Sequence, residues 1–247
     1  MVEHSIFQCM VEYGSLNRND TVLDVGAGLG FLTRFMADKC KRVIAVEADT
    51  ELANILREQL VSVPNVEIIE GNVLEEEVPQ FNKVVSIPPY KISSRLLLWL
   101  FNRGFGCAVL VFQKEFASRL VAKVGSENYG WLTVLTYYYA EAELLNEVPK
   151  CLFYPEPKID SVITCLKSKN PRPFTIRDET TFKQMVQSLF TQRNKKLGNA
   201  VLHYLKGARG MPKENAVEIA KHLTAHGKRV RELAPEDFGA LANALIE

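Results

Sequence analysis

A glycine-rich turn between an apolar run and a helix-like segment is the feature that most constrains how this chain folds. Val22–Val25 is compact and apolar except for Asp24, and it leads into Gly26–Gly30, where every second residue is glycine. Phe31–Lys39 then continues with helical spacing. Glycine lets a backbone turn approach a ligand closely, and the start of a helix offers unpaired N–H groups. The pattern predicts a strand, a ligand-binding turn and a helix; a tight turn that binds no nucleotide is the alternative.

The same alternation of strand and helix continues along the first half of the chain. Strands that alternate with helices predict a mostly parallel sheet covered on both faces, whereas the late strands follow one another directly and are expected to be antiparallel. We expect strands at Val22–Val25, Arg42–Glu47, Val66–Glu70, Lys83–Ser86, Cys107–Phe112, Leu132–Tyr139, Glu141–Val148 and Ser161–Lys167. We expect helices at Ile6–Leu16, Phe31–Lys39, Asp49–Gln59, Leu96–Asn102 and Glu115–Val124.

The strand pattern stops after Lys167–Asp178, a polar segment with two prolines that suits a linker. Helices are expected beyond it at Glu179–Gln192, Lys195–Leu205, Pro212–Leu223 and Pro235–Ile246. We therefore predict two domains, 1–170 and 171–247. Residues 171–247 contain 13 Lys and Arg against 8 Asp and Glu. This basic balance hints at a polyanionic partner, although solvated helix faces explain the charge equally well.

The composition excludes several classes of protein. Hydrophobic residues make up 47% and charged residues 24%, as in a soluble globular chain. No apolar run approaches the roughly 20 residues that cross a bilayer, and the first residues lack the pattern of a signal peptide. The five cysteines are scattered without a CxxC pair, and the four histidines show no ligand spacing. We expect a cytoplasmic protein without a metal, a disulfide framework or a membrane span.

Two further positions suit a nucleoside ligand. Glu47 ends the second strand, and an acid at that place can bind both hydroxyls of a ribose. Gly71-Asn72 follows the third strand, where an amide can hydrogen-bond an adenine edge, although Gly-Asn is also a common turn. The glycines of Gly26–Gly30 are more closely spaced than in G-x-G-x-x-G, which leaves less room for a pyrophosphate.

The stretch Val84–Ser94 (VVSIPPYKISS) ends the fourth strand in a proline pair. The prolines fix the backbone and remove N–H donors, so carbonyl oxygens stay free, and Tyr90 presents a flat face for stacking. Such an arrangement suits an enzyme that stacks on a flat base and forms hydrogen bonds with its amino group. A strand that simply stops at two prolines is the alternative. Ligands bind at the carboxyl ends of parallel strands, so we expect one binding pocket there. Its lining should include Gly26, Glu47, Asn72 and Tyr90.

Five segments resemble the small-subunit ribosomal RNA adenine dimethyltransferase family in its archaeal-type form. They are NKVVSIPPYKISS (82–94), RGFGCAVLVFQKEFASRLVA (103–122), YGWLTV (129–134), FYPEPKIDSVI (153–163) and LFTQRNKKL (189–197). The related erythromycin-resistance rRNA methylases match the later segments less well. The resemblance implies an α/β fold: a Rossmann-like class I methyltransferase core with a mostly parallel seven-stranded sheet, followed by a small all-helical C-terminal domain that binds RNA.

The resemblance also implies site residues. S-adenosylmethionine, without a metal, is expected to be bound by Asp24, Gly26, Gly28, Glu47, Ala48, Asn72, Val73 and Ser86. The target adenine is expected to stack on Tyr90, with Phe153 as a second face, beside acceptors of Ser86, Ile87 and Pro88. RNA contacts are expected from Lys91, Arg193, Lys195 and Lys196. The implied partner is ribosomal RNA in a small-subunit precursor, and we expect a monomer.

Chemistry suggests how such a site works. The N6 lone pair of adenine is delocalised into the ring, so acceptors directed at the two amino hydrogens localise it, and alignment with electrostatics carries methyl transfer without a dedicated base. Two departures from the family matter. The family's asparagine aligns with Ile87, which has no acceptor side chain. The family's N-terminal basic tail and Gly-Gln-x-Phe-Leu block precede the start of this chain, which suggests a short N-terminus or a more open site.

Three hypotheses follow. The first is dimethylation of adenine N6 at two adjacent adenosines near the 3′ end of small-subunit rRNA, coupled to ribosome biogenesis. The second is a paralogue that methylates another RNA, such as large-subunit rRNA. The third, motivated by Ile87 and by the missing N-terminal block, is a catalytically weak ribosome-assembly factor.

Overall fold

The chain forms two compact units in a computed structural model that describes residues 3–223 and 225–245. The first unit comprises the residues up to 117 together with 140–168, and the second comprises 118–139 together with the residues from 169 onward. The sequence pattern instead places 118–139 in the first domain. The chain therefore leaves the first unit after Ala117 and returns to it at Ala140, which a single linear boundary cannot represent.

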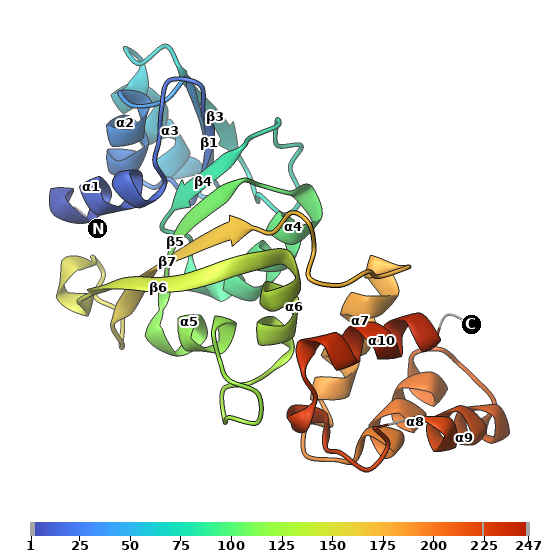
Figure 1. Ribbon diagram of the computed structural model, residues 1–247. Coiled ribbons are helices and arrows are strands. Elements are labelled where there is room, and N and C mark those ends of the chain that lie inside the picture. Colours follow the sequence, from blue (N-terminus) through green and yellow to red (C-terminus); the bar gives the residue numbers. More distant parts are fainter. Residues whose placement is uncertain (1–2, 224, 246–247) are drawn as a thin grey trace. The chain divides into compact units, whose positions relative to one another are not determined.

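A seven-stranded sheet forms the first unit, with strand order β3-β2-β1-β4-β5-β7-β6 (Figure 1). Its strands are β1 (Thr21–Val25), β2 (Arg42–Glu47), β3 (Val66–Glu70), β4 (Lys83–Ser86), β5 (Cys107–Gln113), β6 (Ala140–Val148) and β7 (Ser161–Ser168). Strands β1 to β5 are parallel, and β7 pairs antiparallel with both β5 and β6. The predicted fold class is confirmed.

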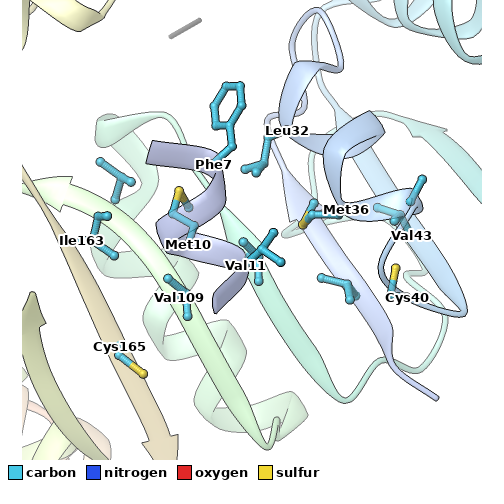
Figure 2. Packing of buried hydrophobic residues seen from close by; sticks show 14 of the residues in the cluster. Phe7, Met10, Val11, Leu32, Met36, Cys40, Val43, Val109, Ile163 and Cys165 are labelled. Carbon is cyan, nitrogen blue, oxygen red and sulfur yellow. The ribbon is translucent and has the colours of Figure 1, made fainter. Parts of the chain in front are cut away.

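Helices cover this sheet because its strands are apolar on both faces. The helices of the unit are α1 (His4–Tyr13), α2 (Phe31–Ala37), α3 (Thr50–Leu60), α4 (Ser93–Arg103) and the beginning of α5 (Lys114–Leu120), with short 3₁₀ turns η1 (Tyr90–Ile92) and η2 (Lys150–Leu152). Figure 2 shows Met10 of α1 near Val109 of β5, and Met36 of α2 near Val43 of β2. The alternate strand residues Leu23, Ile44 and Leu110 are also fully buried, as expected for a parallel sheet covered on both faces.

The second unit is helical. It contains α6 (Trp131–Tyr139), α7 (Glu179–Phe190), α8 (Leu197–Gly207), α9 (Lys213–His222), the 3₁₀ turn η3 (Val230–Glu232) and α10 (Pro235–Ala244). The four helices predicted after the linker are therefore present, whereas the strand predicted at Leu132–Tyr139 is wrong. That segment is rich in Thr, Val and Tyr, which favour strands, and all its residues except Tyr137 are buried. A helix buried on nearly every side has no polar face, so its periodicity resembles that of a buried strand.

None of the helices in residues 3–223 and 225–245 is long and apolar enough to cross a membrane. Within the same described residues, His, Cys, Asp and Glu side chains form no group of three or more that could hold a metal ion.

Candidate active site at the carboxyl ends of the strands

The strand order reverses between β1 and β4, and this is where a doubly wound sheet opens a crevice. The two strands pair only through Val22 with Lys83 and Leu23 with Val84. Beyond these pairs the Ser86 hydroxyl bridges the strands: it donates to the Val25 carbonyl (2.7 Å) and accepts from the Val25 N–H (3.0 Å). Ser86 is fully buried and lines neither cavity described below. The geometry gives Ser86 a strand-bridging role, and its contact with cofactor or base stays a prediction.

The glycine turn after β1 requires glycine at Gly26 and leaves open space at Gly28. Gly26 has φ +73°, and a Cβ there would lie 2.7 Å from Cδ of Pro89. Gly28 also has positive φ (+57°), but a Cβ there would meet no atom within 4 Å. The N–H groups of Gly26 and Ala27 donate to the Val46 carbonyl (2.8 and 3.2 Å), which ties the turn to β2. The turn is therefore fixed on one side and accessible on the other, as a ligand-binding turn needs.

Glu47 lies at the end of β2 with only 8% of its surface exposed. Its two carboxylate oxygens accept from the Gly28 N–H (2.8 Å) and the Asp49 N–H (3.0 Å). These bonds fix the carboxylate and leave each oxygen further lone pairs. Glu47 can thus accept hydrogen bonds from the two hydroxyls of a ribose.

Two cavities share Gly26. One has a volume of about 400 Å³ and is lined by Val25, Gly26, Val46, Glu47, Ala48, Asp49, Gly71, Asn72, Val73, Pro89, Lys91, Ile92 and Arg95. The other has about 410 Å³ and is lined by Phe7, Asp24, Gly26, Ala27, Gly28, Leu29, Phe31, Leu32, Leu52, Ile87 and Tyr154. Every residue predicted to bind the cofactor lines one of them, except Ser86. Lys91, predicted to contact RNA, also lines the cavity of Glu47.

Asp24 is a buried carboxyl at the wall of the second cavity. Its pKa is raised to about 7: burial raises it most, a hydrogen bond from the Thr33 hydroxyl (2.7 Å) lowers it, the negative charge of Glu47 raises it and a hydrogen bond with Ser86 lowers it. Burial dominates because a carboxylate loses its hydration there. A cationic group in this cavity would favour the charged form of Asp24.

The side chain of Asn72 forms hydrogen bonds within its own turn. Its Oδ1 accepts from the Leu74 N–H (3.2 Å), and its Nδ2 donates to the carboxylate of Glu75 (2.8 Å). An amide oxygen has two lone pairs, so one remains for an adenine amino group.

Tyr90 and Phe153 come together although they lie far apart in the sequence. Their ring centroids are 6.3 Å apart, with an interplanar angle of 61°. The Tyr90 hydroxyl lies 2.6 Å from the Ser161 hydroxyl, a partner that the sequence pattern did not reveal. No described residue donates a hydrogen bond to the carbonyl oxygens of Ile87 or Pro88. An aromatic platform and two free acceptors thus flank the end of β4.

The basic residues of the second unit have two different environments. The Arg193 guanidinium donates to the carbonyls of Glu127 (2.7 Å) and Ser126 (3.0 Å), so this predicted RNA contact holds a loop. Lys195 and Lys196 are exposed.

A second basic segment, missed in the sequence, pairs with residues 195–197. The Leu197 N–H donates to the Lys228 carbonyl (2.8 Å), and the Val230 N–H donates to the Lys195 carbonyl (3.1 Å). This pairing brings Lys228 and Arg229 beside the two lysines.

The doubly wound sheet, the glycine turn and the acid at the end of β2 define a class I methyltransferase, which takes its methyl group from S-adenosylmethionine. The chain matches the family described as ribosomal RNA adenine dimethylase over residues 1–243. It therefore belongs to that family and is a methyltransferase of rRNA adenine.

Curated relatives match nearly the whole chain. The probable ribosomal RNA small subunit methyltransferase A of Methanosarcina acetivorans is 39% identical over 96% of this chain and 88% of its own length. Its namesake in Methanopyrus kandleri is 38% identical over 99% and 89%.

Two solved structures also match over almost their full length. A dimethyladenosine transferase from Plasmodium falciparum has a TM-score of 0.82 at 27% identity, covering 99% of this chain and 95% of its own. The 23S rRNA methyltransferase ErmE has a TM-score of 0.69 at 29% identity, covering 99% and 98%.

Proposed function

We propose that this enzyme dimethylates N6 of two adjacent adenosines near the 3′ end of small-subunit rRNA, as a step of ribosome biogenesis in the cytoplasm. The observation that carries the proposal is the meeting of two cavities at Gly26, beside the Tyr90–Phe153 pair and the free carbonyls of Ile87 and Pro88. The small subunit as target is supported by the names of the archaeal relatives.

The residues around Gly26 fit the cofactor. Glu47 would bind the ribose hydroxyls, and Asn72 and Val73 would bind the adenine in the cavity they share. Asp24 and the open side of Gly28 would hold the methionine part in the adjoining cavity. When bound, the cofactor supplies an electrophilic methyl group on sulfur.

The target adenine would stack on Tyr90, with its N6 facing the Ile87 and Pro88 carbonyls. Acceptance of the two amino hydrogens by these carbonyls would draw the N6 lone pair out of the ring and make the nitrogen nucleophilic. As the bond from N6 to the methyl carbon forms, the bond from that carbon to sulfur would break, and N6 would then lose one proton to water. The proline pair holds the carbonyls in place before substrate arrives, so little reorganisation opposes the step. The backbone thus replaces the asparagine side chain that the family carries in the Ile87 position.

The RNA would be bound by exposed cations of the second unit. Lys195 and Lys196 are exposed, and their segment pairs with the one that carries Lys228 and Arg229. Such a cluster can neutralise several phosphates, which is the main source of affinity for RNA.

Mapping of methylated adenines tests the proposal. Unmodified small subunits are incubated with the protein and cofactor, and the rRNA is examined by mass spectrometry. We expect dimethyladenosine at two adjacent positions near the 3′ end, and much less of it after the same incubation with the Tyr90→Ala variant. Cofactor binding without any methylated adenine would contradict the proposal. The likeness to ErmE favours large-subunit rRNA as a second candidate, and the same mapping on large subunits separates the two.

A further inference from the structure

A cavity in the helical second unit combines an unstacked indole with free positive charge. It has a volume of about 360 Å³ and is lined by Arg119, Glu127, Asn128, Tyr129, Gly130, Trp131, Leu132, Phe190 and Arg193. All these residues belong to the second unit. The volume lies at the small end of the roughly 300–1,000 Å³ range of ligand pockets.

The walls of this cavity are built by specific contacts. The Thr133 hydroxyl donates to the Arg119 carbonyl (2.6 Å) and accepts from the Gly130 N–H (3.1 Å), which fixes the end of α5 beside the start of α6. Opposite, the bonds from Arg193 to Ser126 and Glu127 hold the loop.

The floor of the cavity is equally fixed. The Tyr129 ring packs edge-on against Phe190 at 5.6 Å, and its hydroxyl donates to the Leu233 carbonyl (2.7 Å). A cavity with walls and floor fixed in this way is preformed.

Two side chains in the cavity have no partner of their own. The Arg119 guanidinium forms no hydrogen bond or ion pair with a described residue. The partly exposed indole of Trp131 takes part in none of the ring-pair or cation–π contacts among the described residues. In addition, Nε of Arg193 is buried without a hydrogen-bond partner. Two guanidinium groups against the single carboxylate of Glu127 leave a net positive charge.

An indole face and a free guanidinium at one cavity match the two parts of a nucleotide. Bases stack on aromatic faces with little regard to sequence, and guanidinium groups bind phosphate through paired donors. We propose that this cavity binds one nucleotide of the RNA substrate outside the methylation site, with its base on Trp131 and its phosphate at Arg119. The proposal rests on RNA being the substrate.

Trp131 itself reports on the test. The chain has two tryptophans, so Trp99→Phe leaves Trp131 as the sole indole in the full-length protein. We expect AMP to quench its fluorescence, also with cofactor present and in a Tyr90→Ala background. Adenosine or inorganic phosphate alone should bind at least about tenfold more weakly, because each supplies one of the two contacts. Absence of quenching by AMP would overturn the proposal.

Charge-matched variants locate the site. Arg119→Gln should weaken AMP binding and RNA binding about tenfold, whereas Lys206→Gln removes one exposed positive charge elsewhere in the same unit and should change neither. Trp131→Leu should weaken RNA binding similarly while the melting temperature and cofactor binding stay unchanged. Equal effects of Arg119→Gln and Lys206→Gln would overturn the proposal. Methylation mapping is a separate measurement, so failure here leaves the proposed reaction untouched.

Discussion

The Tyr90 hydroxyl lies 2.6 Å from the Ser161 hydroxyl, and this contact joins the residue after the proline pair to the first residue of β7. Ser161 is fully buried and is paired with Gln113 of β5 and Val148 of β6. The Tyr90 ring at the candidate active site is therefore anchored to the sheet through its hydroxyl group. A platform fixed in this way holds its plane before a base arrives, which reduces the cost of stacking.

Ser161→Ala and Tyr90→Phe remove the same hydrogen bond from opposite sides. We expect each variant to raise KM for RNA and to lower kcat. The ratio kcat/KM should decrease by about fivefold to tenfold, since one hydrogen bond contributes about 1 kcal/mol. The double variant should be no worse than either single one, because the interaction is removed only once. Cofactor affinity should stay unchanged in all three. Fully additive effects would show that Ser161 does not act through Tyr90.

Tyr90→Ala removes the stacking surface as well as the hydrogen bond. Removal of one base–aromatic stack costs about 1–3 kcal/mol, so kcat/KM should decrease by about 5-fold to 150-fold relative to wild type. Tyr90→Trp keeps an aromatic face and should retain more activity than the alanine variant. Cofactor binding, measured by calorimetry, serves as the control. Equal activities of the Ala and Trp variants would argue against a stacking role.

We expect Asp24 to make the stability of the fold depend on pH. Its pKa is raised to about 7, chiefly by burial, whereas an unfolded aspartate titrates near 3.8. A group with a raised pKa stabilises the folded state at low pH, and that stabilisation is lost as the pH rises through the folded pKa. The difference in unfolding free energy between wild type and Asp24→Asn should decrease by about 1.4 kcal/mol per pH unit between about pH 4 and 7, then level off.

Urea unfolding at several pH values measures this difference. Asp20 serves as a comparison, because its pKa is shifted in the opposite direction. Burial acts to raise the pKa of Asp20, but hydrogen bonds from Asn82 and Lys83 outweigh it, and the net shift is downward. The stabilisation from Asp20 is therefore present above the unfolded pKa and lost only as the pH falls through the folded one. The corresponding difference for Asp20→Asn should be constant from about pH 5 to 8. A flat curve for Asp24→Asn over the same range would refute the assignment of a raised pKa.

The sequence predicts this fold well wherever local pattern and tertiary environment agree. The parallel strands β1 to β5 are short apolar runs, and turns or polar segments mark their ends. The strand predicted at Leu132–Tyr139 is wrong because a helix buried on nearly all sides carries no periodicity to distinguish it. Prediction of the site residues from the sequence is limited in a similar way.

Residue type alone does not reveal which partner a side chain has. Ser86 and Arg193 are plausible contacts by type, yet Ser86 bonds Val25, 61 positions away, and Arg193 bonds Ser126, 67 positions away. Ser161 was not predicted as a site residue at all, since no local signal in the sequence connects it with Tyr90. Tertiary contacts of this kind decide which polar side chains remain free to bind a ligand.

We expect the second unit to contain two kinds of cation, one that stabilises the fold and one that binds RNA. Arg193→Ala removes two bonds from a charged donor to backbone carbonyls, so it should lower stability by about 1–3 kcal/mol and lower the melting temperature. The double variant Lys195→Ala, Lys196→Ala should keep the melting temperature and weaken RNA binding. The slope of log affinity against log salt should become shallower by about 0.7 for each phosphate that the variant no longer neutralises. An unchanged slope would show that these lysines do not bind phosphate.

Ile87→Asn distinguishes an active enzyme from an assembly factor that has lost catalysis. Ile87 is partly buried against the apolar cluster of Figure 2 and lines the cavity beside Gly26. Because the carbonyls of Ile87 and Pro88 are already free as acceptors, we expect the wild-type enzyme to be active. The variant should then change kcat by less than about tenfold, since one extra acceptor contributes about 1 kcal/mol.

A stability measurement accompanies this comparison. Asparagine loses the apolar packing of isoleucine, so the variant should unfold about 1–3 kcal/mol more easily. Ile87→Val keeps an apolar side chain without an acceptor and controls for altered packing. A silent wild type and Ile87→Val, with strong methylation by Ile87→Asn, would mean that the backbone carbonyls are insufficient and that the protein acts on the ribosome mainly by binding. Methyl incorporation into unmodified small subunits, measured for all three proteins at equal cofactor saturation, decides between the two.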